Sequence, residues 1–188
     1  MCGRYKGQIM KLEESLFKKN KIYKGRAIDF CVDEIILPDG NKAGREYIDH
    51  PGAVAIVPFV DKNNIVLVRQ YRYPVDKITY EIPAGKLDKS KKESLVACAK
   101  RELKEETGYT AKKITKILSF FPSSTFSNEE LYIYLAEGLT AGETHPDEDE
   151  FVEKTIIPFK KAIDMIKTGK IKDAKTVISL LYLKNLKK

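Results

Sequence analysis

The segment Arg101-Glu102-Leu103-Lys104-Glu105-Glu106 carries three glutamates whose spacing suits metal chemistry. In a helix each residue advances by about 100°, which places Glu102 and Glu106 on either side of Leu95, on the apolar face. Glu105 lies next to Glu102 in the same quadrant of the helix. Carboxylates that cluster on a partly desolvated face need a compensating cation. The pattern therefore predicts a metal site on this helix.

A hard divalent ion with oxygen ligands would supply that charge, and we expect Mg²⁺, with Mn²⁺ as the alternative. Glu102 and Glu106 can both reach one ion, and Glu105 can reach a second ion or a bridging water. Arg101 precedes Glu105 by four residues, so an ion pair between these two is an alternative to ligation by Glu105. A helix with ordinary solvated glutamates is the other alternative, and the angular position of Glu102 and Glu106 argues against it.

The elements around this helix follow from apolar patterns and turn residues. Residues 93–107 have helical composition and end at Gly108, which is suited to cap a helix. Two further helices are expected at 159–168 and 174–186. Strands are expected at 53–60 and 65–73, forming a hairpin around a polar turn at 61–64, and also at 78–82, 114–121, 131–137 and 151–158.

Residues 21–49 predict two or three antiparallel strands, with a turn at 38–41. A length of 188 residues favours one main core. We therefore expect an α+β fold in which residues 1–50 form an N-terminal antiparallel β-sheet lobe and residues 51–188 form the catalytic domain.

Composition narrows the functional classes. A hydrophobic fraction of 43% supports a packed core, and a net charge of +7 favours anionic ligands such as nucleotides. Nucleic acid is not expected as a partner, because the lysines are scattered and no binding motif is evident. Three cysteines without CxxC spacing favour a cytoplasmic location over a disulfide framework. No apolar run approaches the roughly 20 residues that span a bilayer, so membrane insertion is not expected.

Motifs of other enzyme classes are missing from the sequence. It contains no GxxxxGK[ST], HExxH or GxSxG, which argues against P-loop kinases, zinc proteases and serine hydrolases. His50 and His145 lack a partner nucleophile motif, and we expect them to be structural or solvated.

Gly85, Glu93 and the run from Arg101 to Tyr109 together resemble the signature of the Nudix hydrolase family. That signature reads glycine, a spacer, glutamate, seven residues, then Arg-Glu-apolar-any-Glu-Glu-any-Gly-apolar. Seven residues separate Gly85 from Glu93, where the family usually has five. The rest of the chain is similar to the ADP-ribose pyrophosphatase branch in the segments VRQYRYP, EIPAGK, FPSSTFSNE, DEDEFVE and GKIKDAKTVISLLYL.

This resemblance implies a mixed β-sheet sandwiched between helices and Mg²⁺-dependent hydrolysis of ADP-ribose to AMP and ribose 5-phosphate. It also implies a homodimer whose N-terminal sheets help to form the active site. Glu102 and Glu106 would be the principal metal ligands, Glu105 an auxiliary ligand, and the backbone carbonyl of Ala84 a further one. Glu148 would be the general base that activates water, and Arg101 and Glu105 are the other catalytic candidates.

The resemblance also assigns the substrate contacts. Arg72 would bind the phosphates, with a surface arginine at a strand end as the alternative. Phe126 would stack near the nucleoside unless it is a core or rim aromatic, and Glu150 would assist at the metals. Thr125 replaces a usual glycine, and because a β-branched residue resists positive φ we expect a different loop conformation.

Two alternatives to ADP-ribose hydrolysis stay open. One is a Nudix hydrolase of another nucleoside diphosphate derivative, such as a nucleotide sugar, a dinucleoside polyphosphate or coenzyme A. The other is a non-hydrolytic module that binds ADP-ribose or RNA, against which the intact glutamates argue.

Overall fold

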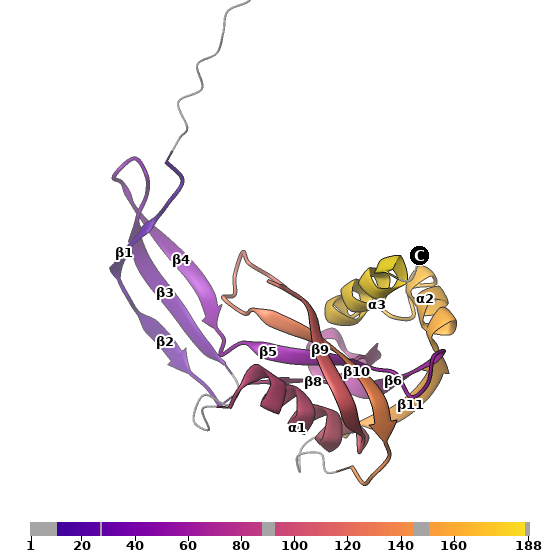
Figure 1. The fold of residues 1–188 in the computed structure, drawn as a ribbon. Coiled ribbons are helices and arrows are strands. Elements are labelled where there is room, and N and C mark those ends of the chain that lie inside the picture. Colours follow the sequence, from indigo (N-terminus) through magenta and orange to yellow (C-terminus); the bar gives the residue numbers. More distant parts are fainter. Residues whose placement is uncertain (1–10, 27, 88–92, 145–150, 187–188) are drawn as a thin grey trace, which may run out of the picture. The chain divides into compact units, whose positions relative to one another are not determined.

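The computed structural model describes residues 11–26, 28–87, 93–144 and 151–186, and the chain in it divides into two units (Figure 1). The first unit comprises Met1–His50 together with Ser123–Asn128. The second comprises Pro51–Pro122 together with Glu129–Lys188.

In the first unit, strand β3 (Asp29–Ile36) is the centre of an antiparallel sheet. β4 (Lys42–Asp49) pairs with it along its whole length, while β1 (Ser15–Lys18) and β2 (Lys21–Lys24) pair with its two ends. The turn between β3 and β4 falls at 38–41, as the sequence predicted. Strand β1 was not predicted.

The short segment Ser123–Asn128 belongs to this unit through hydrogen bonds to β4. The backbone N–H of Ile48 donates to the carbonyl of Phe126 at 2.9 Å, and the Asn128 side chain accepts from the backbone N–H of His50 at 2.7 Å. No local sequence pattern predicts this association, because residues 48 and 126 are far apart along the chain.

The second unit is built on a four-stranded sheet in the order β8-β5-β10-β9, with β10 parallel to β5. Successive side chains of a strand point to opposite faces, and both faces of this sheet are apolar. From β5, Val54 and Ile56 pack against helix α1, and Ala55 and Val57 enter the larger core on the other face. The bounds are β5 (Ala53–Pro58), β8 (Ala84–Lys86), β9 (Thr110–Phe120), β10 (Leu131–Thr140) and α1 (Leu95–Thr107).

The larger core is closed by a second sheet, in the order β11-β6-β7, and by two C-terminal helices. Figure 1 shows α1 on the side of the sheet opposite to α2 and α3. The predicted α+β fold, with a mixed sheet between helices, is confirmed. The remaining bounds are β6 (Asn64–Arg72), β7 (Lys77–Glu81), β11 (Glu153–Pro158), the 3₁₀ turn Tyr73–Val75, α2 (Phe159–Lys167) and α3 (Ala174–Leu186).

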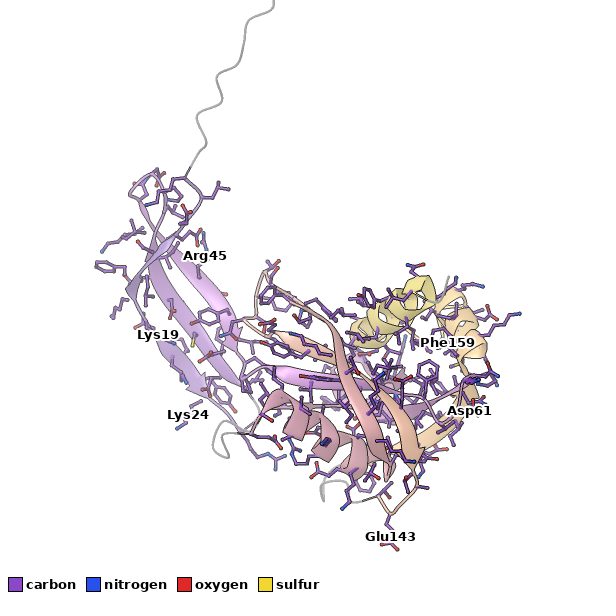
Figure 2. The ribbon with its side chains drawn as sticks, in the orientation of Figure 1. Lys19, Lys24, Arg45, Asp61, Glu143 and Phe159 are labelled. Carbon is purple, nitrogen blue, oxygen red and sulfur yellow. The ribbon has the colours of Figure 1, made fainter. Side chains whose placement is uncertain are left out.

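The predicted hairpin between β5 and β6 is wrong. The chain does turn at Asp61, whose side chain accepts hydrogen bonds from the backbone of Asn63 and Asn64 (Figure 2). Beyond one bridge between Phe59 and Ile65, however, the two strands enter different sheets. Both strands are continuous apolar runs, which are typical of strands buried on two faces rather than of a solvated hairpin.

Among the described residues, no helix combines the length and the apolar character needed to cross a membrane.

Candidate active site

Helix α1 presents the glutamates, and its ends are set by local capping. The Ser94 hydroxyl accepts from the backbone N–H of Ala97 at 3.2 Å, so the helix begins two residues later than predicted. Gly108 ends it with φ of 73°, and its N–H donates to the carbonyl of Lys104 at 2.8 Å. Positive φ is readily adopted by glycine, which explains why the predicted C-cap residue is present.

Glu102 and Glu106 lie on the buried side of α1, with relative exposures of 9% and 6%. Strand β8 packs directly over them. A Cβ atom at Gly85 would lie 1.9 Å from the carboxyl carbon of Glu102, so only glycine leaves the carboxylate its place. The backbone N–H of Ala84 donates to Oε2 of Glu106 at 3.2 Å. The structure thus brings together Ala84 and both glutamates, the residues that the family resemblance implies as metal ligands.

Arg101 organises the other carboxylates of the helix. Its Nη1 lies 2.7 Å from Glu102 and 2.8 Å from Glu105, and its Nε lies 3.0 Å from Glu93. The ion pair between Arg101 and Glu105, which the sequence offers as an alternative to ligation by Glu105, is therefore formed. These contacts, led by the hydrogen bond to Glu93, raise the pKa of Arg101. Glu93 reaches the signature arginine despite the longer spacer that precedes it.

A second arginine lies at the end of β6. Nε and Nη2 of Arg72 donate to the two carboxylate oxygens of Glu81 at 2.8 and 2.7 Å. Glu81, at the end of β7, is almost completely buried and also accepts from Lys175 of α3. Burial raises the pKa of Glu81, but the hydrogen bonds from Arg72 and the charge of Lys175 outweigh it and lower the pKa to about 2.

The donor set on α1 and β8 fits a hard divalent cation. Within the described part of the chain, no three acidic, histidine or cysteine side chains converge as they stand on one metal position. Glu102 and Glu105 are instead turned toward Arg101. Two nearly buried carboxylates one turn apart, with the Ala84 peptide beside them, nevertheless offer the oxygen ligands that Mg²⁺ prefers.

The roles expected for Phe126, Glu148 and Glu150 stay predictions. Phe126 belongs to the first unit, where its side chain is exposed. Glu148 and Glu150 lie outside the described residues. Thr125 does not adopt positive φ. Among the described residues, Asp76 is the one non-glycine residue with positive φ. The loop thus takes a conformation that a β-branched residue tolerates.

Sequence reasoning did not single out Glu81 and Lys175. Their signals were a carboxylate at the apolar end of a strand, in EIPAGK, and a lysine just before an apolar helix, in DAKTV. Glu81 and Lys175 lie 94 residues apart in the sequence, so only the fold reveals that they form a pair.

Comparison with known proteins accords with this geometry. The family model of the NUDIX domain matches residues 49–180. ADP-ribose pyrophosphatase from Bacillus subtilis (strain 168) is 42% identical over 174 residues, covering 92% of this chain and 93% of the relative. Methanol dehydrogenase activator from Bacillus methanolicus is 42% identical over 173 residues, covering 91% and 92%.

A crystal structure of an ADP compounds hydrolase superposes with a TM-score of 0.80 and covers 94% of this chain and 95% of its own. Its sequence identity is 21%, so this likeness concerns the fold. The domain match and the two relatives of high identity, together with the glutamates of α1, show that this chain belongs to the Nudix hydrolase family.

Proposed function

We propose that this protein hydrolyses the pyrophosphate bond of ADP-ribose, with Mg²⁺, to AMP and ribose 5-phosphate. The observation that carries the proposal is the pair of buried glutamates on α1, packed against the glycine of β8. The 42% identity to an ADP-ribose pyrophosphatase over 92% of the chain favours this substrate over other nucleoside diphosphate derivatives.

The metal site consists, in this proposal, of Glu102, Glu106, Glu105 and the backbone carbonyl of Ala84. When bound, Mg²⁺ supplies charge neutralisation of the diphosphate and lowers the pKa of water. Arg101 orients Glu102 and Glu105 through the two hydrogen bonds of its Nη1. Such outer contacts hold ligands in their binding orientation.

The substrate contacts come from other segments. Arg72 binds the phosphate oxygens, for which a guanidinium is suited by its paired donors. Glu148 takes the proton from the attacking water, Glu150 assists at the metals, and Phe126 stacks near the nucleoside. A positioned carboxylate base typically contributes about 100-fold or more to such a reaction.

We also propose a cytoplasmic homodimer, in which residues 1–50 form the dimerising lobe and residues 51–188 the catalytic domain. The first unit leaves large apolar side chains exposed on its short strands, namely Leu16, Phe17, Ile22 and Tyr23. Exposed apolar groups of this size favour association with another protein surface. The free thiols Cys31 and Cys98 favour a reducing compartment. Sedimentation of the purified protein tests the dimer.

The experiment that tests the activity is release of AMP from ADP-ribose by purified protein, with Mg²⁺ and with EDTA. A panel of nucleotide sugars, coenzyme A and diadenosine polyphosphates is assayed in parallel. Metal-dependent turnover led by ADP-ribose is expected. Faster turnover of another panel member would identify a different preferred substrate for the same type of hydrolysis. No turnover of any member would contradict the proposal and favour a binding role.

A further inference from the structure

Glu81 is a buried carboxylate that is surrounded by hydrogen-bond donors. Its relative exposure is 2%, and it accepts from four donors. Two come from Arg72, one from the Thr79 hydroxyl at 2.5 Å, and one from Lys175. A carboxylate this deep needs such compensation to stay ionised. The arrangement therefore keeps a full negative charge fixed behind Arg72.

The consequence for Arg72 is a guanidinium that is held on one edge and open on the other. Nε and Nη2 form a bidentate pair with Glu81, and such a pair fixes the plane of the guanidinium. Nη1 has no hydrogen-bond partner within the described part of the chain, and the side chain as a whole is 44% exposed. Glu81 thus fixes the orientation of the guanidinium and leaves Nη1 available to another acceptor.

The first turn of helix α3 contacts Glu81 and supports its ion pair with Arg72. Lys175 lies 2.9 Å from Asp173, and the hydroxyl of Thr176 donates to Asp173 at 2.6 Å. The same hydroxyl accepts from the backbone N–H of Ile82 at 2.8 Å. The first turn of α3 is therefore bound both to Glu81 and to the peptide that leads into β8. One network supports the exposed arginine and the strand that packs over the glutamates of α1.

We propose that Glu81 is a positioning residue that, with Lys175 as its second cation, fixes the guanidinium of Arg72 for contact with the substrate diphosphate. This inference rests on the proposed function, since it concerns the same site. A merely structural ion pair would need no open edge on its arginine. Here the buried carboxylate engages two of the three guanidinium nitrogens of Arg72, and Nη1 is left available to another acceptor.

A double-mutant cycle tests the proposal by measuring kcat and KM for wild type, Glu81→Gln, Arg72→Ala and the double variant. We expect Glu81→Gln to lower kcat/KM for ADP-ribose by about 10- to 100-fold, mostly through KM, because a misdirected guanidinium loses its phosphate contact. In the Arg72→Ala background the same substitution should change kcat/KM by less than about twofold, because its effect passes through Arg72.

A matched control is available on the same sheet. Glu153 pairs with Arg69 of β6 at 2.8 Å but is exposed, and Glu153→Gln should leave KM unchanged. Thr79→Val removes one hydrogen bond to Glu81 without changing charge, and we expect a rise in KM of about 2- to 5-fold. If Glu81→Gln does not unfold cooperatively and so is not folded, the KM of Thr79→Val tests the role of Glu81 in its place.

The outcomes separate the two proposals. An active wild type whose KM is unaffected by Glu81→Gln, or whose two single effects multiply in the double variant, overturns the role of Glu81 alone. An unchanged KM in Thr79→Val does the same where the first variant does not fold. If wild type prefers another panel member, the cycle is run on that substrate. A wild type without any turnover overturns the proposed function and this inference together.

Discussion

Two arginines of the second unit differ in the number of carboxylates that bind their guanidinium groups. Arg101 lies on the same helix as Glu102 and Glu105, and its guanidinium also bonds Glu93. Arg72 is hydrogen-bonded to a single carboxylate from the neighbouring strand, Glu81, and its side chain is 44% exposed. The guanidinium of Arg101 is thus engaged by three carboxylates, whereas that of Arg72 is oriented by one carboxylate and can still bind another anion.

The difference shows how one residue type serves two tasks. An arginine surrounded by carboxylates neutralises and orients them, which suits a group that supports metal ligands. An arginine clamped on one edge by a buried anion is pre-organised to receive a second anion on the other. We therefore expect substitutions at Arg101 to change the metal requirement and substitutions at Arg72 to change substrate affinity.

The largest effect is expected from Glu106→Gln. This change keeps the shape of the side chain and removes the charge of a nearly buried carboxylate, so we expect turnover to fall by about 1,000-fold or more. The thermal transition should be retained, because Gln can still accept from the Ala84 N–H. Initial rates with saturating Mg²⁺ and a melting curve provide the measurement. Normal turnover would show that Glu106 is not a metal ligand.

Gly85→Ala should affect activity more than folding. The added Cβ would lie 1.9 Å from the carboxyl carbon of Glu102, which is the movable end of a side chain. We expect Glu102 to shift and turnover to fall by about 100-fold, with a small change in melting temperature. Gly44→Ala is the control, because its Cβ would meet nothing within 4 Å. An active Gly85→Ala variant would mean that the position of Glu102 matters little.

Exchange of each arginine for lysine tests the comparison directly. Arg101→Lys should raise the Mg²⁺ concentration for half-maximal rate by about 10-fold or more and change KM little. Arg72→Lys should raise KM for ADP-ribose by about 10-fold and leave the Mg²⁺ requirement unchanged. Titrations of metal and substrate for both variants separate the two effects. Arg69→Lys is the control, and similar responses of Arg72→Lys and Arg101→Lys would refute the division of tasks.

The two regions also differ in how far the sequence predicts them. The glutamates of α1 repeat within one helix, so spacing alone predicted that Glu102 and Glu106 share a buried face, as they do. Glu81 meets Arg72 from another strand and Lys175 from 94 residues away, so no local pattern could join them. The false hairpin between β5 and β6 has the same origin, since sheet pairing depends on distant strands.

The smallest effect that we predict is a pH dependence of stability that belongs to Glu81. Its pKa is about 2 in the folded state, below the ordinary value of 4.5. Between these values the unfolded chain binds more protons, so acid favours unfolding. The contribution of Glu81 is complete above about pH 4.5 and is lost as the pH falls toward about 2.

Glu81→Gln removes this contribution. The difference in the free energy of unfolding between wild type and this variant should therefore shrink by about 2 kcal/mol as the pH is lowered from about 5 to about 3. Urea unfolding of both proteins across this range measures the deficit. Glu153→Gln should stay parallel to wild type, because its carboxylate is exposed and its ion pair is screened. A constant deficit for Glu81→Gln would mean that Arg72 and Lys175 do not hold the carboxylate ionised. Arg72 would then lack the fixed anion on which the proposed difference in role between Arg72 and Arg101 depends.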